Sequence, residues 1–149
     1  MKAVIQRVSH ASVTVEEKVI SKIGPGLLIL IGISPGDTLT DIQWLSNKIA
    51  NLRIFNDENQ IMNRSLTEVH GDAIVVSQFT LLANTKKGNR PSYINAAAPD
   101  IAVPLYEKFI EAFEKLLQKK VGAGIFGADM KIDLQNDGPV TIVIDTQNK

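Results

Sequence analysis

The alternation of apolar and polar positions predicts that the first third of the chain consists of β-strands. Residues 11–15 alternate small apolar side chains with serine or threonine, the two-residue period of a half-buried strand. Residues 16–18, Glu-Glu-Lys, form a polar turn into a second strand over 19–23. The stretch 27–33 is almost entirely apolar and follows a Gly-Pro-Gly break at 24–26, so we expect a strand covered on both faces.

Apolar residues at helical spacing predict two helices. The first carries one apolar stripe, and Thr38 followed by Asp41 resembles a capping box at its start. The second covers roughly residues 100–119, and Pro104 must lie in or near its first turn because a proline deeper inside would break the backbone ladder. The two stripes consist of Ile42, Leu45, Ile49 and Leu52, and of Leu105, Phe109, Phe113, Leu116 and Leu117.

The remaining apolar runs predict further strands, the last two of them separated by a turn at 136–139. These predicted strands are 53–55, 60–62, 73–76, 131–134 and 140–145. The first two flank a polar connector and are expected to close a hairpin. We therefore expect an α+β fold, a single domain over residues 1–149 with mostly antiparallel, barrel-like β layers packed against two main helices.

Composition narrows the class of protein. The 149 residues include 16 basic and 16 acidic side chains, for a net charge of zero, and no cysteine. The lack of cysteine excludes disulfide scaffolds, cysteine-based zinc sites, iron–sulfur clusters and thiol catalysis. The longest apolar run is far too short to cross a bilayer and the N-terminus alternates instead of forming a signal core, so we expect a soluble, cytoplasmic protein without a membrane partner.

Charge is unevenly distributed along the neutral chain. No acidic residue occurs between Asp72 and Asp100, where Lys86, Lys87 and Arg90 fall close together. This cluster suits the phosphate backbone of a nucleic acid, although a solvated loop has the same pattern.

The standard signs of metal and hydrolase chemistry are missing. His10 and His70 are the only histidines, neither has the spacing of a metal ligand, and we expect both at surface turns. No nucleophile elbow, phosphate-binding loop or dinucleotide fingerprint occurs. The sequence thus gives no support for a metal site, a cofactor or a serine-hydrolase triad.

Ser77-Gln78-Phe79-Thr80 is the most unusual local chemistry because it directly follows a predicted buried strand. Hydroxyls, an amide and free backbone N–H groups can converge on a ligand at a strand end, and such donors can hold an oxyanion. The segment contains no acid or histidine to deprotonate a hydroxyl. Its alternative interpretation is a strand end that satisfies its own hydrogen bonds.

Asn136-Asp137-Gly138-Pro139 is the second candidate. An Asp-Gly pair between apolar runs is an ordinary hairpin signal, but the proline that follows removes a donor and restricts the preceding residue. A peptide bond before proline is also the one place where the cis form is accessible at low cost. A rigid Gly-Pro tip can present carbonyls and a steric wall to a ligand, whereas a plain turn is the simpler alternative.

The two segments, read as SQFTLLA and NDGPVT, resemble the signature motifs of the D-aminoacyl-tRNA deacylases. The resemblance extends in order over nearly the whole chain, to MKAVIQRVSHASVTV, IGPGLLILIGI, KKGNRPSY and GIFGADM. Small departures lie in EEK at 16–18 and in the polar tail after Asp145, and neither affects a motif.

This resemblance implies a homodimer that hydrolyses the ester between a D-amino acid and the terminal ribose of tRNA. It also implies activity on glycyl-tRNA, because glycine has no side chain to reject. Gly138-Pro139 would form a cis peptide that reaches into the partner subunit's site and blocks the side chain of an L-amino acid. Ser77, Gln78, Phe79 and Thr80 would line the pocket and bind the amino acid and the ester.

An aminoacyl ester is already activated, and the ribose hydroxyl beside it can assist attack by water, so the protein needs mainly positioning and oxyanion donors. Thr80 as a covalent nucleophile is the rival mechanism, although nothing nearby in sequence would activate its hydroxyl. Lys86, Lys87 and Arg90 become candidate tRNA contacts because KKGNRPSY belongs to the resemblance. Arg7 is a candidate brace for the Gly-Pro segment through a hydrogen bond to a carbonyl.

Two other functions stay open on the sequence alone. A noncatalytic RNA-binding module would use the same basic cluster without turning over an aminoacyl ester. A small-molecule esterase or amidase that depends on Thr80 would act on free D-amino acid esters without needing tRNA.

Overall fold

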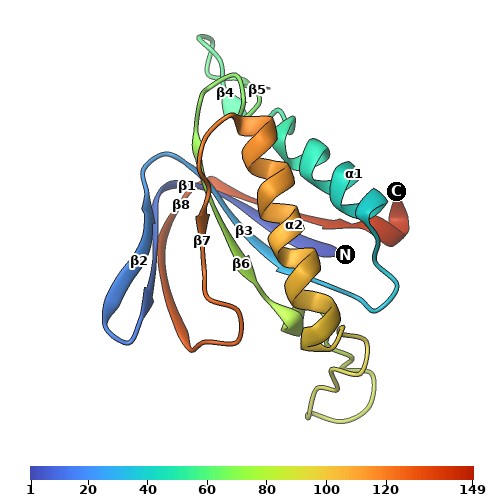
Figure 1. Ribbon diagram of the computed structural model, residues 1–149. Coiled ribbons are helices and arrows are strands. Elements are labelled where there is room, and N and C mark those ends of the chain that lie inside the picture. Colours follow the sequence, from blue (N-terminus) through green and yellow to red (C-terminus); the bar gives the residue numbers. More distant parts are fainter.

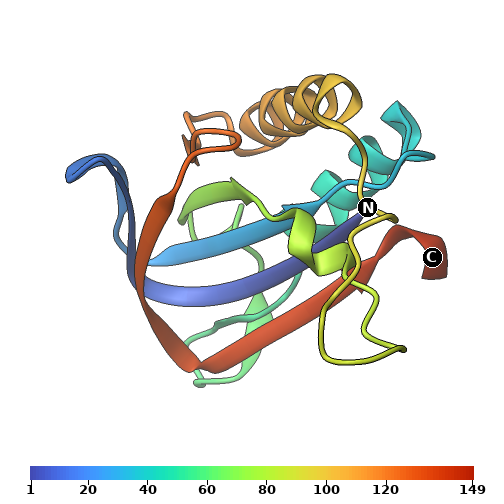
Figure 2. The same ribbon diagram turned by 90° about the horizontal axis from the view of Figure 1, so that it is seen from below.

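The computed structural model describes all residues from Met1 to Lys149 and contains a curved sheet with two α-helices on one side (Figures 1 and 2). A two-stranded hairpin and two short 3-10 helices complete the chain. The elements are β1 (Lys2–Val15), β2 (Lys18–Ile23), β3 (Gly26–Gly32), α1 (Leu39–Ala50), β4 (Phe55–Asn56), β5 (Met62–Arg64), β6 (Asp72–Ser77), η1 (Phe79–Leu82), α2 (Pro99–Leu117), β7 (Gly122–Ala123), β8 (Met130–Asp145) and η2 (Thr146–Asn148).

The main sheet is mixed and nearly closes into a barrel. Its order is β2-β1-β3-β6-β7. β3 pairs with residues 2–8 of β1 and β2 with residues 11–15, whereas β8 pairs with β1 along residues 2–15. The pairs β3–β6 and β6–β7 are parallel, and the remaining pairs are antiparallel. The two ends of this order meet, because Ser21 Oγ on β2 donates to the carbonyl of Ala123 on β7 at 2.7 Å and accepts from its N–H at 3.0 Å. The expected α+β domain with barrel-like β layers is confirmed, although the sheet is less uniformly antiparallel than we expected.

The larger of two clusters of buried apolar residues lies between the sheet and the two helices, which cover the same face (Figure 2). The smaller cluster consists of six residues of β1, β3 and β6. Phe109 and Phe113 of α2 are fully buried and stack at 5.8 Å between ring centroids. Tyr106 fixes α2 to β6, because its hydroxyl donates to the carbonyl of Val75 at 2.7 Å. Burial raises the pKa of this hydroxyl to about 12, so it stays protonated and can donate. Neither α-helix has both the length and the apolar composition that a membrane span requires.

The predicted start of the first helix is confirmed. The Asp41 carboxylate accepts from the backbone N–H of Thr38 at 2.9 Å, which satisfies a donor that no helical carbonyl can reach. The helix ends at Ala50, so Leu52 packs against the core from beyond its C-terminus. The predicted hairpin also forms, as β4 and β5.

The expectation for Pro104 was wrong. It is the sixth residue of α2, which begins with Pro99, and it therefore lies beyond the first turn. Its missing N–H leaves the carbonyl of Asp100 without the usual partner four residues on. The aromatic side chains buried farther along α2 offset this loss, so the helix continues through the proline.

The predicted turn at 136–139 does not reverse the chain. β8 runs through it as one bent strand, and both of its halves pair antiparallel with β1. Two steps along β1, from Gln6 to Val8, correspond to five along β8, from Thr141 back to Asn136, so the intervening residues bulge out of the ladder. His10, expected at a surface turn, is exposed but lies inside β1, which continues without a break from Lys2 to Val15.

Candidate active site

The segment Ser77–Thr80 leaves the sheet at the end of β6 and turns sharply into η1. The N–H of Gln78 still donates to the carbonyl of Ile31 at 2.7 Å, so the turn is fixed to β3. Gly32 permits this close approach, since a Cβ there would lie 3.0 Å from the carbonyl oxygen of Gln78. The first N–H groups of η1 have no acceptor within that helix and are therefore available to an oxyanion.

An apolar cavity of about 320 Å³ opens beside this turn. Ser77, Gln78 and Phe79 line it, and so does the segment 126–130. The structure thus brings the SQFT and GIFGADM motifs together, although some fifty residues separate them in sequence. No local pattern in 126–130 indicates a site, and only the resemblance singled it out. The remaining lining residues are Ile31, Ile33, Val76, Ala97, Ala102 and Ile132.

The basic loop, residues 84–92, lies next to the same turn. Asn84 and Ser92 close it with two backbone hydrogen bonds, and the ring of Tyr93 meets that of Phe79 edge-on at 5.0 Å between centroids. Phe79 is 54% exposed. The three cations predicted to contact tRNA are Lys86, Lys87 and Arg90; all are exposed, and none has a carboxylate within 4 Å.

The cavity contains almost no group that could act as a base. Asp129 is its one titratable residue, but this carboxylate is 85% exposed and paired with Lys131 at 2.9 Å. The amide of Gln78 donates to Thr80 Oγ1 at 2.5 Å, which withdraws electron density from the hydroxyl instead of activating it. His70 is exposed at a turn, as expected, and neither histidine lines the cavity. Nowhere in the molecule do three His, Asp or Glu side chains converge.

The Gly-Pro loop, residues 136–140, is held from both sides. Arg7 is buried and donates through Nε to the carbonyl of Asp137 at 2.8 Å, which is the contact expected of it, and through Nη1 to that of Ile54 at 2.6 Å. The side chain of Asn136 spans the loop, accepting from the N–H of Val140 at 2.8 Å and donating to its carbonyl at 3.2 Å. The Gly138–Pro139 peptide bond is cis.

Within one chain, the Gly-Pro loop does not reach the Ser77–Thr80 segment. Ser77 is level with Ala3 on β1 through its partner Ile31, whereas the loop is level with Arg7. Four residues along β1 correspond to about 13 Å, and β6 and β8 are in addition separated by two strands. Both views show the bend in β8 far from η1 (Figures 1 and 2).

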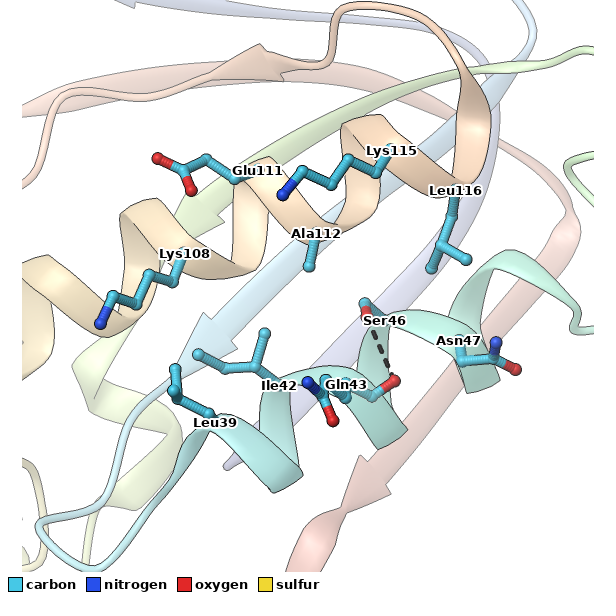
Figure 3. Close-up of a pocket in the computed structure, with 10 residues that line it drawn as sticks. All are labelled: Leu39, Ile42, Gln43, Ser46, Asn47, Lys108, Glu111, Ala112, Lys115 and Leu116. Carbon is cyan, nitrogen blue, oxygen red and sulfur yellow. Dashed lines mark hydrogen bonds between the residues drawn. The ribbon is translucent and has the colours of Figure 1, made fainter.

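A second hollow lies between α1 and α2, but its chemistry is that of helix packing. Leu39 and Ile42 of α1 point toward α2, and Leu116 of α2 points toward α1. Lys108 and Lys115 extend along α2 (Figure 3). The Ser46 hydroxyl is already used, since it donates to the carbonyl of Gln43 at 3.3 Å. No set of polar groups converges there, so the cavity beside Ser77–Thr80 is the better candidate.

Known proteins resemble this chain over its whole length. A sequence model of the family described as D-Tyr-tRNA(Tyr) deacylase matches residues 4–145. Proteins named D-aminoacyl-tRNA deacylase from Flavobacterium psychrophilum and Christiangramia forsetii are 62% and 64% identical, each over 100% of this chain and 99% of the relative.

Two solved structures share the fold. One, named c-Myc DNA Unwinding Element Binding Protein, is 41% identical and superposes with a TM-score of 0.93 over 98% of this chain and 99% of its own. The other, described as a probable eukaryotic D-amino acid tRNA deacylase, is 18% identical, with a TM-score of 0.83 over 96% and 97%. At that identity the second shows similarity of fold alone.

Proposed function

The chain belongs to the D-Tyr-tRNA(Tyr) deacylase family of hydrolases that cleave the aminoacyl-tRNA ester, and from this we propose a chiral editing site shared between two copies of the chain. Each site would take Ser77–Thr80 from one copy and Gly138–Pro139 from the other. The observation that carries the proposal is the distance between these two segments within one chain. In a single copy the Gly-Pro loop does not reach the pocket, and no pocket residue of the same chain lies beside the loop.

β8 offers a surface for the second copy. It pairs with β1 only, so most of its outer edge presents unpaired backbone groups. Val143 on this strand is 69% exposed, and Ile132 and Ile142 are only partly buried. A free edge with apolar side chains favours association, and a two-fold dimer is the commonest way to satisfy it.

The residues at the pocket favour hydrolysis by positioning. The ester is already activated, and the ribose hydroxyl beside the scissile bond can assist the attack of water. Backbone N–H groups at the start of η1 would stabilise the oxyanion, while Ser77 and Gln78 orient the amino acid. Thr80 is a poor nucleophile here because its oxygen accepts a hydrogen bond and no base lies beside it.

Chirality would be selected by exclusion. The Gly-Pro loop is held by Arg7 and Asn136, so it can act as a wall that does not yield to an L side chain. A D side chain points away from this wall, and glycine has no side chain to exclude. The site would therefore accept D-aminoacyl-tRNA and glycyl-tRNA while sparing the L-aminoacyl-tRNA used in translation.

The basic loop is the proposed contact for the tRNA backbone. Lys86, Lys87 and Arg90 carry unpaired positive charge in the loop that follows η1, and Tyr93 directly after this loop contacts Phe79 of the pocket. The name of the 41% identical structure also describes a related chain as binding nucleic acid. With such a substrate, the enzyme would act in the cytoplasm.

The test is a deacylation time course on matched D- and L-tyrosyl-tRNA and on glycyl-tRNA, with a chelator present. We expect rapid loss of D-tyrosine and glycine while L-tyrosine is spared. Tight tRNA binding without turnover of any substrate would instead identify a noncatalytic RNA-binding module. Hydrolysis of a free D-tyrosine ester at the rate of the tRNA ester would identify a small-molecule esterase.

A further inference from the structure

A polar cavity of about 620 Å³ lies at the C-terminal end of η1, whereas the apolar cavity beside Ser77 lies at its start. Phe79 at the start of η1 lines the apolar cavity, whereas Leu82 at its end lines the polar one. Four residues of 3-10 helix extend about 8 Å, so the two cavities are neighbours. The polar side chains that line it come from Lys2, Ser34, Asn84, Thr85, Lys86, Asn95 and Gln147.

The floor of the polar cavity is the turn 34–36, which Asp37 holds in place. Its carboxylate accepts from the N–H of Ser34 at 2.6 Å and from the buried ammonium group of Met1 at 2.5 Å. On the opposite side, the N–H of Lys86 donates to Asn84 Oδ1 at 3.0 Å and fixes the start of the basic loop. The cavity therefore exists before any ligand binds.

The lining has the charge and the donors of a nucleotide site. Lys2 and Lys86 are its only charged residues, and no carboxylate lines it. Lys2 Nζ lies 3.8 Å from Asp145, but Lys86 has no such partner, so net positive charge remains. Asn84, Asn95 and Gln147 supply amides, which can both donate to and accept from the edge of a base.

We propose that the polar cavity binds the penultimate nucleotide of the substrate RNA, with Lys86 at the phosphodiester that joins it to the aminoacylated terminal nucleotide. The inference rests on the proposed function, because the aminoacyl ester of the terminal nucleotide must lie at the pocket at the start of η1. A dinucleotide spans the length of η1, and its single phosphate would meet Lys86 at the mouth of the cavity. The remainder of the strand would then continue along the basic loop.

Gly36 allows a test that leaves the fold intact. It lines the cavity, a Cβ added there meets nothing within 4 Å, and its backbone is not in the left-handed region. Gly36→Glu thus introduces a negative charge into the cavity without a clash. Gly24→Glu is the matched control, since Gly24 has equally open surroundings and lies in the turn before β3, outside the cavity.

The measurement is the affinity of the intact protein for uncharged cytidylyl-(3′→5′)-adenosine and for adenosine, which lacks the phosphate. We expect Gly36→Glu to weaken dinucleotide binding about tenfold relative to Gly24→Glu, the size of one charge-assisted contact. Lys86→Gln should weaken it similarly, whereas Lys87→Gln in the same loop should weaken it far less, because Lys87 does not line the cavity. Equal affinities for the dinucleotide in Gly36→Glu and Gly24→Glu would overturn the inference.

Turnover separates this inference from the proposed function. In one outcome, the wild type binds the dinucleotide, Gly36→Glu and Lys86→Gln weaken this binding, and D-tyrosyl-tRNA is not deacylated. This result would support the subsite and contradict the proposed deacylase function. A wild-type protein that deacylates D-tyrosyl-tRNA, with Gly36→Glu and Gly24→Glu equal in both rate and dinucleotide affinity, would retain the deacylase and refute the subsite.

Discussion

The hydroxyl of Thr80 distinguishes the two mechanisms, attack by water assisted by the substrate ribose and covalent attack by the protein. Gln78 donates to its oxygen, so the side chain is arranged as an acceptor and has no base to take its proton. We expect Thr80→Ala to lower kcat for D-tyrosyl-tRNA by about tenfold or less, the effect of losing one positioning contact. Replacing the free ribose hydroxyl beside the ester of the substrate by hydrogen should lower kcat at least about 10²-fold, because this removes the group that assists the attack of water.

Rapid-quench kinetics on the same variant provide the check. A covalent acyl-enzyme trapped in the wild type, together with complete loss of activity in Thr80→Ala, would assign the nucleophile to the protein. The serine variant Thr80→Ser is the matched control, since it keeps the oxygen and should retain the wild-type rate in either mechanism.

Arg7 breaks the apolar pattern of β1, where Ala3 and Ile5 occupy the preceding buried positions, and its contacts explain why. Its guanidinium supplies donors to the carbonyls of Asp137 and Ile54. Arg7→Met keeps the buried stem but leaves both carbonyls without that donor, so we expect a loss of about 1–3 kcal/mol in the free energy of unfolding. The preference for D- over L-tyrosyl-tRNA in kcat/KM should fall roughly tenfold as the wall loosens.

Urea unfolding and matched kinetics on both substrates measure the two effects. Arg53→Met is a suitable control, because Arg53 also donates to a backbone carbonyl, that of Asn63, and makes no hydrogen bond to the Gly-Pro loop. An unchanged D-to-L ratio in Arg7→Met, despite the lost stability, would mean that the loop does not set stereoselectivity.

Among the elements, α1 owes part of its stability to an ionised carboxylate. Lys149 lies 2.8 Å from Asp41, and this contact, together with the hydrogen bonds from Thr38, holds the pKa of Asp41 well below its ordinary value of 3.8. A lowered pKa stabilises the folded state above the unfolded-state pKa, and the gain disappears as pH falls through the folded-state value. Asp41→Asn should therefore cost about 1 kcal/mol at pH 7, the usual loss of a cap.

The deficit of Asp41→Asn should persist down to about pH 4 and shrink below it, as the wild-type carboxyl becomes protonated. Urea unfolding of both proteins at a series of pH values tests this. A deficit that stays constant down to pH 2 would show that the asparagine disturbs packing and that the charge itself contributes little.

Element prediction succeeded where the pattern is local and failed where a distant strand decides. The apolar run at 27–33 and the stripe of α1 are sufficient to identify β3 and the first helix. Asp137-Gly138 has the composition of a hairpin turn, yet the chain does not reverse there. The 14 residues of β1 offer hydrogen-bonding partners to both halves of β8, and this long-range pairing overrides the local signal.

The molecule as a whole explains why the sequence predicts the site only in part. The strand-end chemistry of Ser77–Thr80 can be recognised locally. Ser77, Gln78 and Phe79 line a cavity, whereas Thr80, expected there too, does not line it and accepts a hydrogen bond from Gln78. The lining by residues 126–130 and the contact of Tyr93 with Phe79 depend on how the chain folds back, which no local spacing encodes. The wall that we propose for Gly138–Pro139 would come from a second copy, so the pattern of one chain could not reveal it.

A mixed dimer tests this shared site directly. We would combine a loop variant, Pro139→Ala, with an excess of a pocket variant, Gln78→Ala/Thr80→Ala, after confirming that the pocket variant alone is inactive. If the loop acts across the interface, each mixed dimer pairs an intact pocket with an intact loop from the other chain.

Pro139→Ala alone should either hydrolyse L-tyrosyl-tRNA or lose activity, because the wall has lost its ring. Mixing should then restore the D-to-L ratio in the first case, or recover D-tyrosyl-tRNA hydrolysis in the second, to about half of the wild-type rate per mixed dimer since one of its two sites is whole. If each chain used its own loop, every intact pocket would keep a defective wall, and mixing would dilute the activity without changing its stereoselectivity. That outcome would contradict the shared site, and a wild-type chain that sediments as a monomer while deacylating at full rate would do so as well.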